Sequence, residues 1–593
     1  MYERNHNLLY SKVRQYLIPA VMMKLALQLG NVVDTMLVGN ILGKDAMAAV
    51  GITIPVLSMV QIPAYFLGNG GAVYAGILLG RRQKQKAGEL FTSMFVITVL
   101  LNAIFFCSSF FVSKPLAHWM CRGSGAEADV ASCVFIYLLC SPVFCMGVFL
   151  SRFISADSHP KVASAYYIVS NMINLTLDVV FLKFTDLGVK GTALATVLGF
   201  TSGLIVTVFY IRSTRRMLAF SRPRLTAEML KSTLSAGMPH LSYLVVVMVK
   251  GFVLNAVVLA FLKEYGIVIY TVCSNISLIL KMCIGGLMEV IPYTVSILYG
   301  EKDFSGIRAV VKRVFHYAVP VTCLLMAVIL LFPNAFAFLF GIRDPETQSV
   351  ILPVLRIYAV SLPFQMCNYF GIQYYGSVEK SMLATLVSLL ENGIIMIPAI
   401  SIGILLSQKM HISGFTGMAI GFVVSEMFTI LLSVLFQKKR YPCDSILLIP
   451  LKNDALCHDF TIRSRVEDAV GVAQEIQHFC QSNGIEKGKA NMIAVAVEEM
   501  VVNISRYGGK KSWWIDICVS IEEHSEAEEQ EIQPSYCITL RLRDNGIPFD
   551  PTAYDEDETG MEYDIHGIDI VRSMAQNITY IRAMDLNNTT ITI

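Results

Sequence analysis

Residues 77–90 have the sequence ILLGRRQKQKAGEL, and residues 297–310 have the sequence ILYGEKDFSGIRAV. In both stretches an apolar run ends at a glycine, and charged residues follow it. The two glycines are 220 positions apart, as are Pro19 and Pro239, each of which precedes a long apolar run. Two landmarks at one offset predict that much of the chain consists of two related halves.

The composition of the chain changes sharply near residue 440. Of all 593 residues, 54% are hydrophobic and only 16% are charged, and the charged ones become frequent after this point. Before it, apolar stretches of roughly twenty residues recur, and each can cross the ~30 Å hydrocarbon layer as a helix. Twelve such spans are expected, at residues 15–38, 46–68, 91–113, 130–152, 162–184, 190–212, 236–260, 267–291, 314–338, 350–372, 382–404 and 413–435. The last ~150 residues are enough for one globular domain.

The distribution of Lys and Arg predicts the orientation of these spans. With the N-terminus inside, the inner loops carry most of the cations, as at 81–86 and 438–440, whereas outer loops have isolated ones such as Lys44. Lys and Arg are enriched in cytoplasmic loops. We therefore expect an integral protein of a bacterial inner membrane, with both termini and the C-terminal domain in the cytoplasm.

The two halves have the same orientation, because an even number of spans separates their landmarks. LGVKGTALATVLG (187–199) and SGFTGMAIGFVVS (413–425) form a further related pair. Parallel repeats are related by an axis along the membrane normal, and the substrate path usually lies between them. We expect an all-α polytopic membrane protein, with one six-helix lobe over residues 1–225 and a second over residues 226–440.

Ionisable residues inside membrane spans are costly and therefore point to function. Asp34 lies near the outer end of the first span, and Asp178 lies in the fifth, with Asn174 one helical turn before it on the same face. At ~1.5 Å per residue, the two aspartates are about 27 Å and 24 Å from the inner ends of their helices. Thr196 in the sixth span lies at a similar depth. These oxygens suit Na⁺, and clustered carboxylates can instead carry a proton; alternatively, the aspartates only cap helix ends.

The second half lacks this cluster. Leu254 stands 220 positions after Asp34, and the region that matches Asp178 is apolar. Four charged residues lie near mid-span instead: Lys250, Lys281, Glu391 and Glu426. Opposite charges at one depth neutralise each other, so we expect a structural role for them, with a place in the substrate cavity as the alternative.

Residues 15–436 resemble the multidrug and toxin extrusion (MATE) family. The resemblance rests on VVDTMLVGNILGKDAMAAVGITIPV and, further along, on SADSHPK, NMINLTLDVVF and LGVKGTALATVLG. It implies two six-helix lobes that export organic compounds in exchange for H⁺ or Na⁺. It also implies that Asp34, Asn174 and Asp178 bind the coupling cation, and Thr196 follows from the same match. The acidic second-lobe site of some members is absent from the seventh span here.

The remainder of the chain is expected to form a linker over residues 441–455 and a separate domain over residues 456–593. In this domain a strand (CHDFTIR) precedes two helices (VEDAVGVAQEIQHFCQSNG and IAVAVEEMVVNISRYGG). Two strands (WWIDICVSI and YCITLRLRD), a helix at HGIDIVRSMA and two closing strands (ITYIRAM and TTITI) follow. This alternation predicts an α/β sandwich. Because a single linker joins it to the last span, we expect it to contact only the end of the second lobe.

Three groups of residues in this domain have the composition of a nucleotide site. Glu499 and Asn503 are four positions apart, so both project from one helix face. An amide oxygen there can hold Mg²⁺, and a carboxylate can orient a water or hydroxyl. Asp544 and Gly546 follow a strand, where Asp can accept a hydrogen bond from an exocyclic amine and Gly lets the backbone approach. Gly567 precedes a helix, whose N-terminal amides suit phosphate.

Together and in this order, these motifs resemble the nucleotide-binding domain of anti-sigma-factor serine kinases and related histidine-kinase ATPases. EEMVVNISRYG, DNGIPFDP and GIDIVRSM carry the resemblance. It implies ATP and Mg²⁺ as cofactors, with Glu499 as general base and Asn503 as magnesium ligand. Asp544 would bind adenine, and Gly567 belongs to the second glycine motif. Tyr507 stands where many serine kinases have His, so ATP binding is expected and kinase activity stays open.

Three classes of function follow. The first is a cation-coupled antiporter that exports small organic or drug-like compounds and carries a regulatory ATP-binding domain. The second is a flippase for lipid-linked saccharides, and the third is a membrane sensor whose kinase domain phosphorylates a protein partner. ATP-driven pumping is not expected, because the chain has no GxxxxGK[ST] loop. The expected partners are a small organic substrate and membrane lipid, and no nucleic acid.

Overall fold

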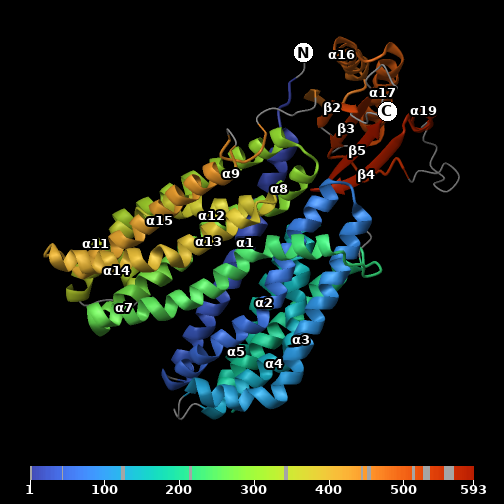
Figure 1. Cartoon of the computed structure of the whole chain (residues 1–593). Helices are drawn as coiled ribbons and strands as arrows, with labels where there is room; N and C mark the ends of the chain where they lie inside the picture. The colour runs from blue at the N-terminus through green and yellow to red at the C-terminus, as the bar shows by residue number, and fades with distance from the viewer. Residues whose placement is uncertain are drawn as a thin grey trace.

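A computed structural model of the chain describes residues 3–42, 44–121, 127–212, 217–339, 345–442, 445–450, 456–509, 514–524, 535–552 and 566–593. Within these ranges, the side chains of residues 27–36, 263–268 and 271–280 and of some single positions are not described. The described residues form a large bundle of helices and a smaller domain built on a sheet (Figure 1).

The first lobe contains the helices α1 (Asn7–Ile41), α2 (Lys44–Gly80), α3 (Lys84–Cys121), α4 (Glu127–Ala156), α5 (Pro160–Phe184) and α6 (Val189–Ile211). Large apolar side chains cover its outside, and Phe111 and Phe184 are 81% and 77% exposed. In water such a surface would be unfavourable, whereas lipid tails accept it. The apolar composition that predicts these spans is therefore found on the outer surface of the bundle as well as in its core.

The second lobe contains α7 (Ala227–Met288), α8 (Val290–Gly300), α9 (Phe304–Leu331), α10 (Pro333–Leu339), α11 (Pro345–Ala359), α12 (Leu362–Ser377), α13 (Ser381–Leu389), a π-helical turn η1 (Leu390–Ile394), α14 (Met396–Lys409) and α15 (Gly414–Arg440). At ~1.5 Å per residue, α7 would be about 90 Å long, or three times the hydrocarbon thickness. Its residues therefore supply the seventh expected span and most of the eighth. Within the described residues, ten helices are long and apolar enough to cross a membrane, or eleven if the bent pair α11 and α12 is one span.

The two glycines of the repeat meet where α2 packs against α8. A Cβ atom added to Gly80 would lie 2.9 Å from the Cα of Gly300 and 2.1 Å from the carbonyl oxygen of Ile297. A Cβ atom added to Gly300 would lie 2.9 Å from the Cα of Gly80 and 2.3 Å from the carbonyl oxygen of Ile77. Only glycine allows this approach of the two backbones. Equivalent positions of two repeats touch in this reciprocal way near a local symmetry axis, which therefore passes between α2 and α8.

The C-terminal domain contains β1 (Leu456–Arg463), α16 (Asp468–Ser482), α17 (Lys487–Tyr507), β2 (Trp514–His524), β3 (Ser535–Asp544), α19 (His566–Met574), β4 (Asn577–Ala583) and β5 (Leu586–Thr592). The strands form one antiparallel sheet in the order β1-β2-β3-β5-β4. Each of the expected strands and helices of this domain is present.

Alternation along β3 gives this sheet two different faces. Leu540 and Leu542 belong to the core that the sheet shares with α16 and α17. Arg541 and Arg543 point to the opposite face, because successive side chains of a strand alternate. In Figure 1 the sheet lies between α16 and α17 on one side and the ends of the membrane helices on the other. Asp544 lies on the face that α16 and α17 cover. Adjacent residues of β3 therefore belong to opposite faces of the sheet.

Candidate functional site: a buried Asn–Asp pair, an inter-lobe cavity and a nucleotide-type site

The structure brings Asn174 and Asp178 together on α5. Nδ2 of Asn174 donates to Oδ2 of Asp178 at 3.0 Å, and the two residues are 8% and 0% exposed. A carboxylate this deeply buried requires a cation or a proton to neutralise it. Asp34 belongs to α1, which packs against α5, but its side chain lies outside the described residues.

Thr196 lies on α6, beside this pair. A Cβ atom added to Gly199 would lie 2.7 Å from Cβ of Asn174, so these two positions are level with each other. A short turn joins α5 and α6, which run in opposite directions. One turn farther along α5 therefore brings Asp178 level with Thr196 on α6. Oγ1 of Thr196 donates to the carbonyl of Thr192 at 2.9 Å, which leaves its lone pairs as acceptors for a cation.

Three charged residues that sequence reasoning missed lie between the two lobes. Lys24 on α1 and Arg152 on α4 both contact Glu289, which stands between α7 and α8, with N–O distances of 3.0 Å and 2.9 Å. They line a cavity of about 270 Å³, which Lys281 and Glu391 also line. A usable signal is present in the sequence, because each of the three is a charged residue within an apolar stretch.

The expected pairing of charges in the second lobe is found for one pair. Nζ of Lys281 lies 3.0 Å from Oε1 of Glu391. Glu426 instead accepts a hydrogen bond from Nδ2 of Asn368 at 2.7 Å. Lys281 and Glu391 also line the inter-lobe cavity. From the sequence, pairing with each other and lining the substrate cavity were alternatives for these residues. In the structure, Lys281 and Glu391 do both.

The helix α17 carries one side of a nucleotide-type site in the C-terminal domain. A Cβ atom added to Gly567 would lie 1.9 Å from Oε2 of Glu499, so the start of α19 lies directly against the Glu499 carboxylate. Asn503, one turn after Glu499, is 9% exposed, and its Nδ2 has no hydrogen-bond partner among the described residues. An unpaired buried amide is costly, and a ligand at this position would satisfy it.

The turn after β3 closes the site at the end of α17. The amide of Ile547 donates to the carbonyl of Gly508, immediately after α17, at 3.0 Å. Oδ1 of Asp544 accepts hydrogen bonds from the amide of Gly546 at 2.7 Å and from Nδ2 of Asn587 at 3.0 Å. Burial raises the pKa of Asp544 above its usual value, and these two donors oppose the rise. They hold Oδ1 of the carboxylate in place.

These residues fit ATP and Mg²⁺. Asp544 offers an acceptor for the exocyclic amine of adenine, and Asn503 offers an amide oxygen to Mg²⁺. The N-terminal amides of α19 suit phosphate, and Gly567 keeps that end of the helix against Glu499. All the residues expected to hold the nucleotide therefore lie around the C-terminal half of α17.

The opposite face of the sheet docks on the second lobe. Arg543 pairs with Glu301 and lies 3.1 Å from Oδ2 of Asp303, and Arg541 lies 3.4 Å from the same oxygen. Arg4 contacts both carboxylate oxygens of Asp303 at 2.7 Å. Burial alone would raise the pKa of Asp303, but the charges of Arg4 and Arg541 hold it well below its usual value. The contribution of Asp303 to docking is therefore complete above about pH 3.9 and is lost only as the pH falls further, toward the folded-state pKa.

The same domain also docks on the first lobe, so the expectation that it contacts only the second lobe is wrong. The turn between β4 and β5 makes these contacts. The amide of Met584 donates to Oγ of Ser158, between α4 and α5, at 2.7 Å. Oδ2 of Asp585 lies 3.3 Å from Nζ of Lys12 on α1. The single covalent linker does not limit which surfaces the folded domain can reach.

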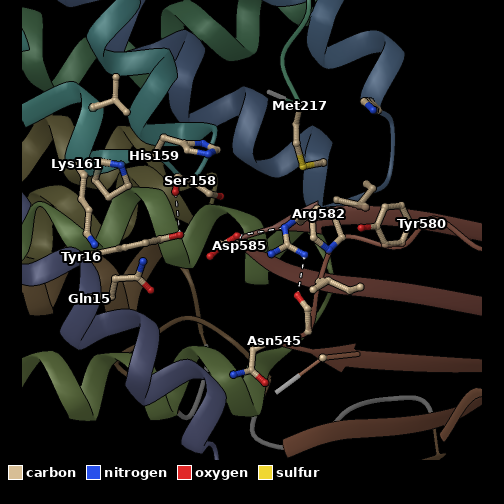
Figure 2. A pocket seen from close by; sticks show the side chains of 18 residues that line it. Gln15, Tyr16, Ser158, His159, Lys161, Met217, Asn545, Tyr580, Arg582 and Asp585 are labelled. Carbon is tan, nitrogen blue, oxygen red and sulfur yellow. Dashed lines mark hydrogen bonds and ion pairs between the residues drawn. The ribbon is translucent and has the colours of Figure 1, made fainter. Parts of the chain in front are cut away.

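Hydrogen bonds connect the nucleotide-type site with the first lobe, and Figure 2 shows the part of them around Arg582 and Asp585. Arg582 donates to the carbonyl of Gly546 at 3.2 Å and lies 2.7 Å from Oδ1 of Asp585. It also donates to Oδ1 of Asn587 at 2.7 Å, the residue whose Nδ2 holds Asp544. Because Asp585 in turn pairs with α1, a continuous set of contacts runs from Asp544 to the first lobe. It borders a cavity of about 920 Å³ between the domain and that lobe.

Two family models match separate parts of the chain. The MatE model matches residues 19–180, and the model of the histidine kinase-like ATPase domain matches residues 462–593. The second match begins within β1 and ends with the chain, so it covers nearly the whole C-terminal domain.

Curated proteins and solved structures resemble the membrane part. The multidrug export protein MepA of Staphylococcus saprophyticus is 22% identical over 444 residues, which cover 72% of this chain and 93% of that protein. The probable multidrug resistance protein YoeA of Bacillus subtilis is 21% identical over 354 residues, which cover 58% and 75%. A MOP-superfamily transporter from Pyrococcus furiosus and an outward-facing multidrug resistance MATE transporter each have 18% identity and a TM-score of 0.66, covering 74% of this chain and 98% of theirs. These likenesses show the fold of the MATE transporters.

Proposed function

We propose that this chain, which joins the fold of the MATE transporters to a histidine kinase-like ATPase domain, is an antiporter of a bacterial inner membrane. It exports small organic or drug-like molecules in exchange for H⁺ or Na⁺. ATP and Mg²⁺ bind its cytoplasmic domain and regulate transport. The two membrane lobes carry the substrate and the cation, and the cytoplasmic domain changes how fast they do so.

The geometry of the first lobe supports the cation site. Asp178, Asn174 and Thr196 place a carboxylate, an amide and a hydroxyl at one level of α5 and α6. This set can release and rebind H⁺ or Na⁺ as the lobe becomes hydrated. Asp34 of the adjoining α1 is assigned to the same site.

The cavity between the lobes supports a small substrate. Its volume of about 270 Å³ is close to the lower end of the range of about 300–1,000 Å³ for small-molecule sites. It is lined by both cations and carboxylates, and by the rings of Tyr65, His240 and Tyr293. A lipid-linked saccharide would need more space, so export of small organic molecules is the better fit. The names of the curated relatives point in the same direction.

One observation carries the regulatory role, namely that the ATPase domain docks on both lobes at once. Alternating access requires the two lobes to move against each other around the substrate site. A domain bound to Asp303 of one lobe and Lys12 of the other must therefore release or strain a contact during the cycle. Ligand binding near Asp544 can bias that step, and couplings of ~1–3 kcal/mol are typical of such effects.

Energy supply and regulation can be separated in proteoliposomes that contain the full-length protein. We expect uphill efflux to follow an imposed H⁺ or Na⁺ gradient and to stop when ionophores collapse it, even with saturating ATP. The reason is that each charge crossing 100 mV supplies ~2.3 kcal/mol, whereas the sequence has no GxxxxGK[ST] loop for ATP-driven pumping. Sustained uphill efflux on ATP alone would contradict this division of roles.

Lys12→Gln should remove the effect of ATP on the transport rate while leaving gradient-driven transport without ATP close to wild type. The substitution breaks the pair with Asp585 and with it the connection between Arg582 and α1. Lys161→Gln is the matched control, because Lys161 borders the same cavity but is exposed. If ATP changes the rate of the Lys12→Gln protein as it changes that of wild type, regulation does not pass through this contact.

A further inference from the structure

A second polar cluster lies in the second lobe, apart from Asn174 and Asp178. Its members come from separate helical segments: Lys281 on α7, Asn368 on α12, Glu391 in η1 and Glu426 on α15. Glu391 and Glu426 are only 2% and 1% exposed. Two carboxylates buried in one membrane lobe must each be neutralised.

The two carboxylates are neutralised in different ways. Glu391 has a counter-ion, because Nζ of Lys281 lies 3.0 Å from its Oε1. In the part of the chain that the structure describes, the side chain of Glu426 has a single, neutral donor, the Nδ2 of Asn368 at 2.7 Å from its Oε2. Among the described residues its Oε1 has no hydrogen-bond partner. An ionised carboxylate without a counter-ion is far more costly in a low dielectric than a protonated one. The contacts of Glu426 therefore favour the protonated carboxyl group.

The surroundings of Glu426 favour the same state. The charge of Glu391 repels a second carboxylate, and Lys281 already pairs with Glu391. Among the described side chains, the titratable groups that face this pair and Glu426 from the neighbouring elements are Tyr243 and Lys250 on α7 and Tyr358 on α11. Lys250 is a second cation near Glu426, and it can neutralise Glu426 once the proton has left.

The cluster is connected to the space between the lobes. Lys281 and Glu391 line the cavity of about 270 Å³, so water there can exchange protons with the pair. Glu391 stands in the π-helical turn between α13 and α14. Such turns are rare and occur frequently at functional sites. Glu391 therefore lies between the water of the cavity and the buried Glu426.

We propose that Glu426 and Glu391 form a proton-binding site of the second lobe, in which Glu426 holds the proton in the conformation of this structure. The proton comes from water of the cavity and forms an O–H bond with Oε1 of Glu426. On release it returns to water, and Lys281 or Lys250 then neutralises the carboxylate. The role of this site in coupling rests on the proposed antiport function, whereas the binding of the proton does not.

Infrared difference spectroscopy of the full-length protein in lipid nanodiscs tests the site directly. At neutral pH, wild type should have the carbonyl band of a buried protonated carboxyl group, and Glu426→Gln should lose it. Glu346→Gln, at an exposed position of α11, is the matched control and should retain the band. Because a protonated Asp178 would have a band of its own, the two spectra are compared, and an identical carbonyl band in wild type and in monodisperse Glu426→Gln protein would overturn the proposal.

A second variant keeps the test decisive if Glu426→Gln does not fold. Glu391→Gln retains Glu426 but frees Lys281 to pair with it, so Glu426 should release its proton and the band should vanish at neutral pH. An unchanged band in Glu391→Gln would overturn the assignment. If the band depends on Glu426 but no gradient drives efflux, the antiport function fails and the proton site stands. If efflux follows the gradient and wild type has no such band, the proton site alone fails.

Discussion

Asp178→Asn should reduce gradient-driven efflux to the level of protein-free liposomes. The Asp178 side chain is fully buried and accepts a hydrogen bond from Asn174 at 3.0 Å. An amide of the same shape still accepts that bond, so the fold should be retained. It cannot bind a proton, however, and it is a weaker ligand for Na⁺ than a carboxylate. Efflux would be measured in proteoliposomes under separately imposed pH and Na⁺ gradients.

Asp34→Asn should have the same effect, because α1 packs against α5 and Asp34 is assigned to the same cation. Asp186→Asn is the matched control, since Asp186 is exposed in the turn between α5 and α6. Size-exclusion profiles and the midpoint of thermal unfolding would verify that each variant is folded. Wild-type transport by both the Asp34 and Asp178 variants would remove the cation site from the first lobe.

The architecture of the membrane part could be predicted because its causes are local. A helix must be apolar over about 20 residues to cross the membrane, and a repeated landmark needs no knowledge of packing. The reciprocal contact of Gly80 and Gly300 follows from that repeat. The Asn174–Asp178 pair was equally accessible, because residues four apart lie on one face of a helix.

The inter-lobe contacts could not be predicted in the same way. Lys24, Arg152 and Glu289 come from different helices, and they meet only because the lobes pack as they do. The sequence marks each of them as a costly intramembrane charge, but it does not say which helices are neighbours. The same limit applies to Glu426 and Asn368, whose hydrogen bond joins α15 to α12.

The docking of the C-terminal domain was even less predictable from the sequence than the inter-lobe contacts. Charged residues on one face of a strand usually indicate a face in water, yet Arg541 and Arg543 are buried against the second lobe. Arg4 precedes α1, and its partner Asp303 follows α8, so the ion pair joins residues 299 positions apart. Such a surface becomes visible only when the two domains are seen together.

Asp544→Ala should raise the Kd for ATP by about 10- to 100-fold, because a hydrogen bond to a charged group contributes about 1.5–3 kcal/mol. The carboxylate is held in place by Gly546 and Asn587, so its free oxygen meets the adenine amine without a loss of side-chain entropy. Asn503→Ala should weaken ATP binding most when Mg²⁺ is present, since its oxygen acts on the metal and its unpaired Nδ2 can donate to the nucleotide. Calorimetry on the full-length protein with and without Mg²⁺ would measure both.

A matched substitution distinguishes this site from general damage to α17. Asn491 stands on the same helix as Asn503, but it is exposed and distant from the turn at Asp544. Asn491→Ala should therefore leave the Kd for ATP unchanged. Both substitutions replace Asn by Ala on one helix and so change helix propensity equally. A difference in Kd between the two variants therefore reports the contact of Asn503 with the ligand and not the stability of α17. Equal losses of affinity in the two variants would mean that α17 merely supports the fold, and an absence of ATP binding in folded wild type would remove the nucleotide site.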